Sequence, residues 1–177
     1  MLEQEIREVE LLEVARAMVI AARTAPKGKG VDNLFACIIT KAEIQGLHDR
    51  MLELFKQTDG PVFMINGEDI LKAECIVVLG ARDMPLGLKQ CGFCGFADCR
   101  EKEQSGKGRC AISMNDLGIA IGSAVAVAAD RRVDTRIMYS IGYAMLHFKM
   151  LPADVVAAHG IPLSASSKNP FFDRVFK

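Results

Sequence analysis

The sequence has 177 residues, of which 50% are hydrophobic and 25% charged, and its 22 basic residues balance its 22 acidic ones. This length and composition are typical of one folded unit, so we expect a single α+β domain over residues 1–177. The zero net charge, the two tyrosines and the absence of tryptophan argue against a surface that binds nucleic acid.

No segment of the sequence predicts export or membrane insertion. The first residues, MLEQEIREVE, are acidic and lack the apolar core of a signal peptide, so we expect a cytoplasmic protein. The longest apolar stretch, residues 117–129, is shorter than the ~20 residues that cross a bilayer, and it predicts a buried helix. A reducing compartment favours metal ligands or reactive thiols over disulfides for the six cysteines.

Hydrophobic periodicity predicts the helices and strands in chain order. Helices are expected over residues 2–23, 41–57 and 136–149, and from Asn115 or Asp116 to residue 129. Strands are expected over residues 34–40, 62–65, 74–79 and 155–163, the last at a sheet edge because Gly160 and Pro162 interrupt it.

The periodicity also predicts which side chains are buried. Helix 2–23 should bury Ile6, Val9, Leu12, Ala15, Val19 and Ala22. Helix 41–57 should bury Ile44, Leu47, Met51, Leu54 and Phe55, and helix 136–149 should bury Ile137, Ile141, Ala144, Met145 and Phe148. Gly118 and Gly122 predict close helix packing. In the tail, Phe171, Phe172 and Phe176 should dock on the body of the protein or on a second subunit.

Four cysteines are clustered in the segment CGFCGFADCREKEQSGKGRC, at Cys91, Cys94, Cys99 and Cys110. Around them, residues 85–114 form a glycine-rich and charged segment without periodicity, which predicts a metal-ordered loop. A glycine follows each of the first two cysteines, where positive φ lets thiolates point toward one centre. The helix start near Asn115 and the basic residues Lys89, Arg100, Lys107 and Arg109 would favour an anionic cluster.

This pattern favours an iron–sulfur cluster over three alternatives. Structural zinc usually takes two Cys-x2-Cys pairs, and this segment has one such pair. Disulfides require an oxidising compartment, and isolated buried cysteines do not gather four to a segment. Four thiolates in one compact loop favour a 4Fe-4S cluster over a two-iron one.

The remaining cysteines and the histidines predict no site. Cys37 and Cys75 lie within apolar strands and are interpreted as small buried hydrophobic residues. His48, His147 and His159 show no ligand spacing and are expected on the surface or in the core.

Together with the cysteines, the segments ARTAPKGKGVDN (22–33) and GIPLSASSKNPFFDR (160–174) resemble a prokaryotic family described as containing a ferredoxin domain. That resemblance implies an iron–sulfur site on the four cysteines. The cysteine spacing is also similar to four-iron modules of corrinoid iron–sulfur proteins, which usually have a longer gap before the fourth ligand, at Cys110 here.

A more distant resemblance is to FMN-dependent nitroreductases. It rests on Ala25-Pro26, on Asn33 and on the Gly160-Ile161-Pro162 strand followed by Lys168. It implies an α+β nitroreductase-like fold, a mixed or antiparallel central sheet flanked by helices with the cysteine segment as an insert, and a symmetric homodimer that exchanges C-termini. By this resemblance Lys27, Asn33 and Lys168 would contact FMN, although the paired arginines before the first helix and the Gln-Pro-Trp after the asparagine are absent.

Three functions follow as hypotheses. The first is a cluster-binding redox protein that passes electrons to a flavin, a small molecule or a partner protein. The second is an FMN-binding oxidoreductase, and the third is a non-enzymatic protein with a structural zinc or cluster.

Overall fold

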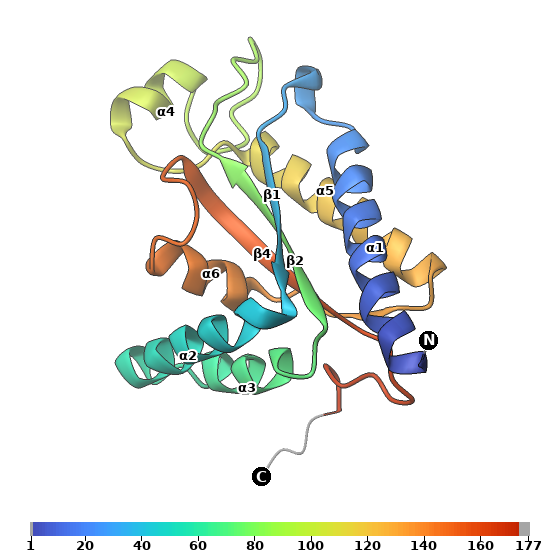
Figure 1. Ribbon diagram of the computed structural model, residues 1–177. Helices are drawn as coiled ribbons and strands as arrows, with labels where there is room; N and C mark the ends of the chain where they lie inside the picture. The colour runs from blue at the N-terminus through green and yellow to red at the C-terminus, as the bar shows by residue number, and fades with distance from the viewer. Residues whose placement is uncertain (1, 174–177) are drawn as a thin grey trace.

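Helices cover both faces of one antiparallel sheet in the computed structural model, which describes residues 2–173 (Figure 1). The four strands have the order β1-β2-β4-β3. In chain order the elements are α1 (Glu3–Thr24), a short 3-10 turn (Gly28–Gly30), β1 (Leu34–Thr40), α2 (Lys41–Thr58), α3 (Pro61–Ile70), β2 (Cys75–Arg82), α4 (Cys99–Ser105), α5 (Ala111–Asp130), β3 (Asp134–Thr135), α6 (Tyr139–His147) and β4 (Val155–Ser164).

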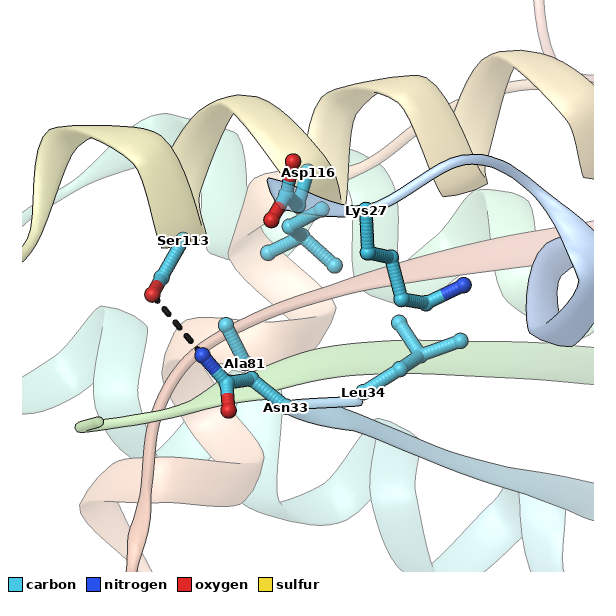
Figure 2. Close-up of a pocket in the computed structure, with 7 residues that line it drawn as sticks. Lys27, Asn33, Leu34, Ala81, Ser113 and Asp116 are labelled. Atoms are coloured by element: carbon cyan, nitrogen blue, oxygen red, sulfur yellow. Dashed lines mark hydrogen bonds between the residues drawn. The ribbon is translucent and has the colours of Figure 1, made fainter. Parts of the chain in front are cut away.

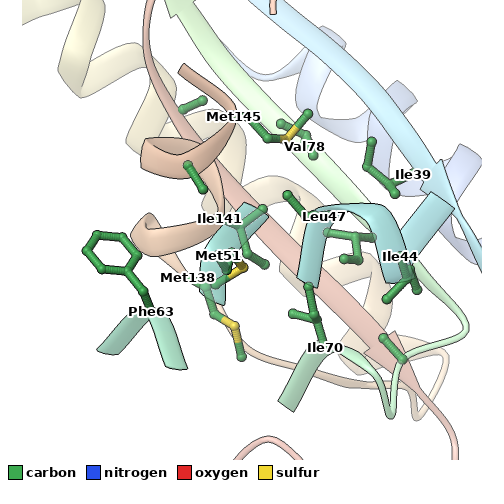
Figure 3. Packing of buried hydrophobic residues seen from close by; sticks show 14 of the residues in the cluster. Ile39, Ile44, Leu47, Met51, Phe63, Ile70, Val78, Met138, Ile141 and Met145 are labelled. Carbon is green, nitrogen blue, oxygen red and sulfur yellow. The ribbon is translucent and has the colours of Figure 1, made fainter. Parts of the chain in front are cut away.

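Two hydrophobic cores lie on opposite faces of the sheet. One packs α2, α3 and α6 against the sheet, and its buried side chains include Met51, Ile70, Val78 and Ile141 (Figure 3). The other packs α1 and α5 against the opposite face. Strand β2 is buried on both faces, so its run CIVVLGA is apolar at every position instead of alternating.

The last strand, β4, is not at the sheet edge, so that prediction is wrong. It pairs with β2 from Cys75↔Leu163 to Arg82↔Val155, and the two-residue strand β3 pairs with its far end. On the side away from β2, Gly160 exchanges both backbone hydrogen bonds with Met138, at 3.0 and 2.8 Å. Pro162, two residues later, faces that same side, so its missing N–H removes no hydrogen bond to β2.

The prediction of a strand over residues 62–65 is also wrong, because these residues lie in helix α3. Pro61 occupies the first turn and follows Gly60 at the N-cap, an arrangement that favours a helix start. The buried residues Phe63, Asn66, Gly67 and Ile70 have helical spacing. A four-residue apolar window is too short to reveal that period.

Helix α1 turns a different face to the core than its apolar residues suggested. Ala15 and Ala22 are buried as predicted, but Ile6 and Val9 are 44% and 58% exposed. The buried set is Leu11, Val14, Ala15, Met18 and Ala22. In α2 the prediction is confirmed for Ile44, Leu47, Met51 and Leu54, which are buried, whereas Phe55 is only partly buried. In α6, Ile141, Ala144 and Met145 are buried as predicted, but the predicted burial of Ile137 is wrong, because this residue precedes the helix and is 47% exposed.

Helix α5 begins earlier than predicted, with Cys110 as its N-cap instead of Asn115 or Asp116. Within residues 2–173 it is the one helix with the length and apolar composition to cross a membrane, properties that core helices share. Its inner face, which includes Leu117, Ala120 and Ala124, packs in the core with α1 and the sheet, as predicted for a buried helix. Gly118 and Gly122 lie on its outer face, where no atom of residues 2–173 outside the backbone of α5 and the adjacent residues lies within 4 Å of an added Cβ. The close helix packing predicted for these glycines is therefore not found within the described residues.

The C-terminal tail docks on the body through Phe171, which is fully buried in the core beside α2, α3 and α6. Arg136 holds the tail by donating from Nη1 to the Phe171 carbonyl at 2.7 Å. Phe172 is 62% exposed, and its ring lies 4.7 Å from the Arg136 guanidinium. Phe176 lies outside the described residues.

Candidate metal centre

The cysteine segment leaves the body where β2 ends and rejoins it where α5 begins, at one end of the sheet (Figure 1). Gly92 and Gly95, which follow Cys91 and Cys94, have positive φ angles of 82° and 86°, as their spacing predicted. The Gly95 N–H donates to the Gly92 carbonyl at 2.9 Å and closes a tight turn. The short helix α4, which the sequence did not reveal, follows this turn.

Two of the cysteines lie at helix starts. Cys99 opens α4, directly after Asp98, whose carboxylate accepts from the Glu101 N–H at 2.8 Å and caps the helix. Cys110 is the N-cap of α5 and is buried. Both thiols are therefore fixed by regular backbone rather than by loop alone.

Three of the four predicted ligands line one cavity. Cys94, Cys99 and Cys110 surround it together with Pro85 and Lys102. Cys91 does not line this cavity and is exposed on the loop. In residues 2–173 no group of three or more His, Cys, Asp or Glu side chains is close enough to hold a metal ion.

The chemistry of the cavity suits soft, thiolate-bound metals. Three cysteines line it, and no Asp or Glu among residues 2–173 does. Burial raises the pKa of Cys110, but hydrogen bonds from the N–H and hydroxyl of Ser113 and from the N–H groups of Leu86 and Ile112 outweigh it, so the pKa falls below the ordinary value. The same donors would stabilise a metal-bound thiolate.

The two cysteines outside the segment have the opposite character. Burial raises the pKa of Cys37 to about 11 and that of Cys75 to about 12, with further increases from Glu43 and Glu74 respectively. Both pack in the cores, as predicted for small hydrophobic residues. The three histidines are separate too, on α2, α6 and β4.

A second candidate site involves the loop after α1, which contains two of the predicted flavin contacts. Lys27 and Asn33 line a small cavity between this loop, β2 and the start of α5 (Figure 2). The Lys27 ammonium donates to the Ala22, Arg23 and Ala25 carbonyls at 3.0, 2.7 and 2.8 Å, and so caps α1.

Asn33 joins this loop to the cysteine segment. Its Nδ2 donates to Ser113 Oγ at 2.9 Å and to the Met84 carbonyl at 3.2 Å. Its Oδ1 is buried and has no hydrogen-bond partner in the described part of the chain. A buried amide oxygen without a donor costs free energy, so it is a candidate to accept from a ligand.

Lys168, the third predicted flavin contact, lies elsewhere. It follows β4, is 72% exposed and pairs with Asp173 at 2.6 Å. Nearby, Arg7 near the start of α1 donates to the Ala165 carbonyl at 3.0 Å, whereas Lys27 and Asn33 follow the opposite end of that helix. The 22 residues of α1 span about 33 Å, so one chain does not bring the three side chains together.

Comparisons with known proteins identify the family. A model of the family described as "Uncharacterized protein containing a ferredoxin domain (DUF2148)" matches residues 107–174. An uncharacterised protein of Archaeoglobus fulgidus is 39% identical over 183 residues, covering 99% of this chain and 97% of the relative. The chain belongs to this ferredoxin-domain family.

Solved structures show that the ferredoxin-domain protein has a nitroreductase-like fold. A nitroreductase with bound FMN from Bacteroides fragilis has a TM-score of 0.60 at 13% identity, covering 93% of this chain and 80% of that one. A nitroreductase with bound FMN from Desulfitobacterium hafniense has a TM-score of 0.61 at 15% identity, covering 88% and 78%. The predicted α+β, nitroreductase-like fold with an antiparallel sheet is confirmed.

Two residues at the cysteine cavity were not predicted from the sequence: Lys102, which lines the cavity, and Asp83, which accepts a hydrogen bond from Lys102. Asp83 stands at the end of β2, and Lys102 lies one helical turn after Cys99. The i, i+3 spacing of Cys99 and Lys102 was the available signal, because it places both on one face of a helix.

Proposed function

We propose that this ferredoxin-domain protein is an iron–sulfur redox protein. Cys91, Cys94, Cys99 and Cys110 would hold the cluster, of the 4Fe-4S type, which supplies one-electron transfer when bound. Electrons would pass through it to a flavin, a small molecule or a partner protein. The proposal places the protein in the cytoplasm, where thiols stay reduced.

One observation carries the proposal: three cysteines from separate points of the segment line a single cavity at the start of α5. Hydrogen bonds from the α5 start lower the pKa of Cys110 there against the effect of burial, which is the environment that a thiolate ligand requires. Cys91 would complete the set through movement of its exposed loop. The fold and the family description agree with redox chemistry.

Metal analysis of anaerobically purified protein tests the proposal. We expect brown protein that contains iron and loses its visible absorbance with dithionite. Cys94→Ala should lose the iron, whereas Cys37→Ala, a cysteine in β1 away from the cavity, should keep it. Colourless protein with stoichiometric zinc would contradict the redox role and would support a structural metal instead.

A second candidate is an FMN-binding oxidoreductase, supported by the buried Asn33 Oδ1 and by the fold of the FMN-bound neighbours. Because Lys27 and Asn33 lie far from Lys168 in one chain, these residues could share a flavin only across a homodimer. Denaturation of the purified protein should then release flavin fluorescence. Asn33→Ala should abolish that fluorescence, while Lys29→Ala on the same loop should retain it.

The outer face of α5 supports a homodimer in this proposal. Gly118 and Gly122 are exposed there beside Ile119, which is 40% exposed, and small residues at this spacing let two helices approach closely. We expect a dimer by analytical ultracentrifugation. Gly122→Arg should yield monomers, and Gly46→Arg, on the exposed face of α2, should remain dimeric. A wild-type monomer would remove the dimer and the shared flavin site together.

A further inference from the structure

Lys102 is the one buried lysine or arginine in the described residues, with 6% of its surface exposed. Its ammonium donates to Asp83 Oδ1 at 2.9 Å. A buried ammonium requires a compensating charge, because its transfer from water to the protein interior removes the hydration that stabilises the charge. Asp83 supplies one negative charge, and Arg109 shares it.

Asp83 is attached to the rigid part of the fold. It directly follows β2, and its N–H donates to the Asp154 carbonyl at 3.1 Å. Its second oxygen accepts from Arg109 Nη1 at 3.0 Å. One carboxylate at the end of the sheet therefore binds both halves of the cysteine segment, at Lys102 in α4 and at Arg109 next to Cys110.

Lys102 also lines the cavity that Cys94, Cys99 and Cys110 surround. The two cations on Asp83 leave a net positive charge beside these thiols. A cluster bound by four thiolates is anionic, and each electron that it accepts adds one negative charge. A cation held beside it without bulk water stabilises the reduced form more than the oxidised form.

We propose that Lys102, held by Asp83, is a positioning residue of the cysteine site that closes the segment and raises the reduction potential of its cluster. This inference rests on the proposed iron–sulfur function. The reaction that it modifies is the addition of one electron to the cluster, supplied in vitro by dithionite, with no bond made or broken in the protein.

The test compares Lys102→Met, Lys102→Arg and Lys107→Met in anaerobically loaded protein. Lys107 is exposed on the same segment and serves as the matched control. Redox titration with dithionite should give a lower midpoint potential for Lys102→Met, a potential near wild type for Lys102→Arg, and no change for Lys107→Met. Iron loss to a chelator should become about tenfold faster in Lys102→Met, the usual cost of losing an outer-shell partner.

A second pair of variants tests the attachment to the sheet if Lys102→Met does not fold. Asp83→Asn should also speed iron loss, whereas Glu103→Gln, exposed on α4, should not. The inference alone is overturned if the wild-type protein binds iron but the Lys102 and Asp83 variants match their controls in midpoint potential and in the rate of iron loss. Wild-type protein that binds no iron overturns the proposed function itself.

Discussion

Phe171→Ala tests whether the C-terminal tail belongs to the core of its own chain. The Phe171 ring is fully buried against α2, α3 and α6, and truncating such a ring costs about 3–5 kcal/mol. Its neighbour Phe172 is 62% exposed, and its ring lies against the Arg136 guanidinium. Phe172→Ala should therefore cost only about 0.5–1 kcal/mol, the value of an exposed cation–π contact.

Urea unfolding of the metal-free protein, followed by circular dichroism, measures both changes in the free energy of unfolding. The two residues are adjacent and have the same side chain, so a difference between the two variants reports the difference in burial. If Phe171→Ala loses less than about 1 kcal/mol, or no more than Phe172→Ala, the ring does not occupy the core in solution. A loss that depends on protein concentration would instead indicate that the tail docks on a second subunit, because association then contributes to stability.

Three further predictions concern packing, a helix cap and the thiols. Gly142→Ala should destabilise the protein by about 1–3 kcal/mol in urea unfolding, because the added Cβ would collide with the backbone of β4. Gly46→Ala should instead stabilise α2 by about 0.5–1 kcal/mol, because open space surrounds an added Cβ at that position. Hydrogen bonds from Thr40 lower the pKa of Glu43. The contribution of this carboxylate to stability is therefore present above its ordinary pKa of 4.5 and is lost as the pH falls through the lowered value. The free energy of unfolding of Glu43→Gln should thus equal that of the wild type only at low pH. Because burial raises the pKa of both strand cysteines to about 11 or 12, a thiol reagent at pH 8 should label at most four of the six cysteines in native metal-free protein, and labelling of all six would contradict their burial.

Elements with a long and consistent period could be predicted from the sequence. In α2, four apolar residues at helical spacing are buried as expected, and Thr40 with Glu43 forms a capping box at its start. The strand predicted over residues 62–65 was wrong because four apolar residues fit a strand or a buried helix equally well, and the Gly-Pro pair before them was interpreted as a turn.

The prediction of the buried face of α1 was wrong for a different reason. This helix carries apolar residues on more than one face, with Val9 and Ile20 both exposed, and only the position of α5 decides which face turns inward. That choice depends on tertiary packing that no local period encodes.

The cysteine segment shows the same division. The positive φ angles of Gly92 and Gly95 could be predicted directly from the residue type, because only glycine adopts positive φ without strain. The start of α5 could not be predicted, since Asn115 and Asp116 are better caps by residue type than Cys110. The contact between Asp83 and Lys102 joins residues 19 apart and depends on how α4 folds back on the sheet.

The place of β4 inside the sheet has a consequence for biosynthesis. Its partner β2 is complete at residue 82, but Cys75 pairs with Leu163, which is synthesised 88 residues after it (163 − 75). All four cysteines of the segment therefore leave the ribosome before the strand that completes the sheet, and α5 has no finished surface to pack on until then. Metal delivered during translation would meet a flexible thiol-rich chain rather than a shaped cavity. The order of synthesis thus favours loading of the proposed cluster only once β4 has been inserted into the sheet.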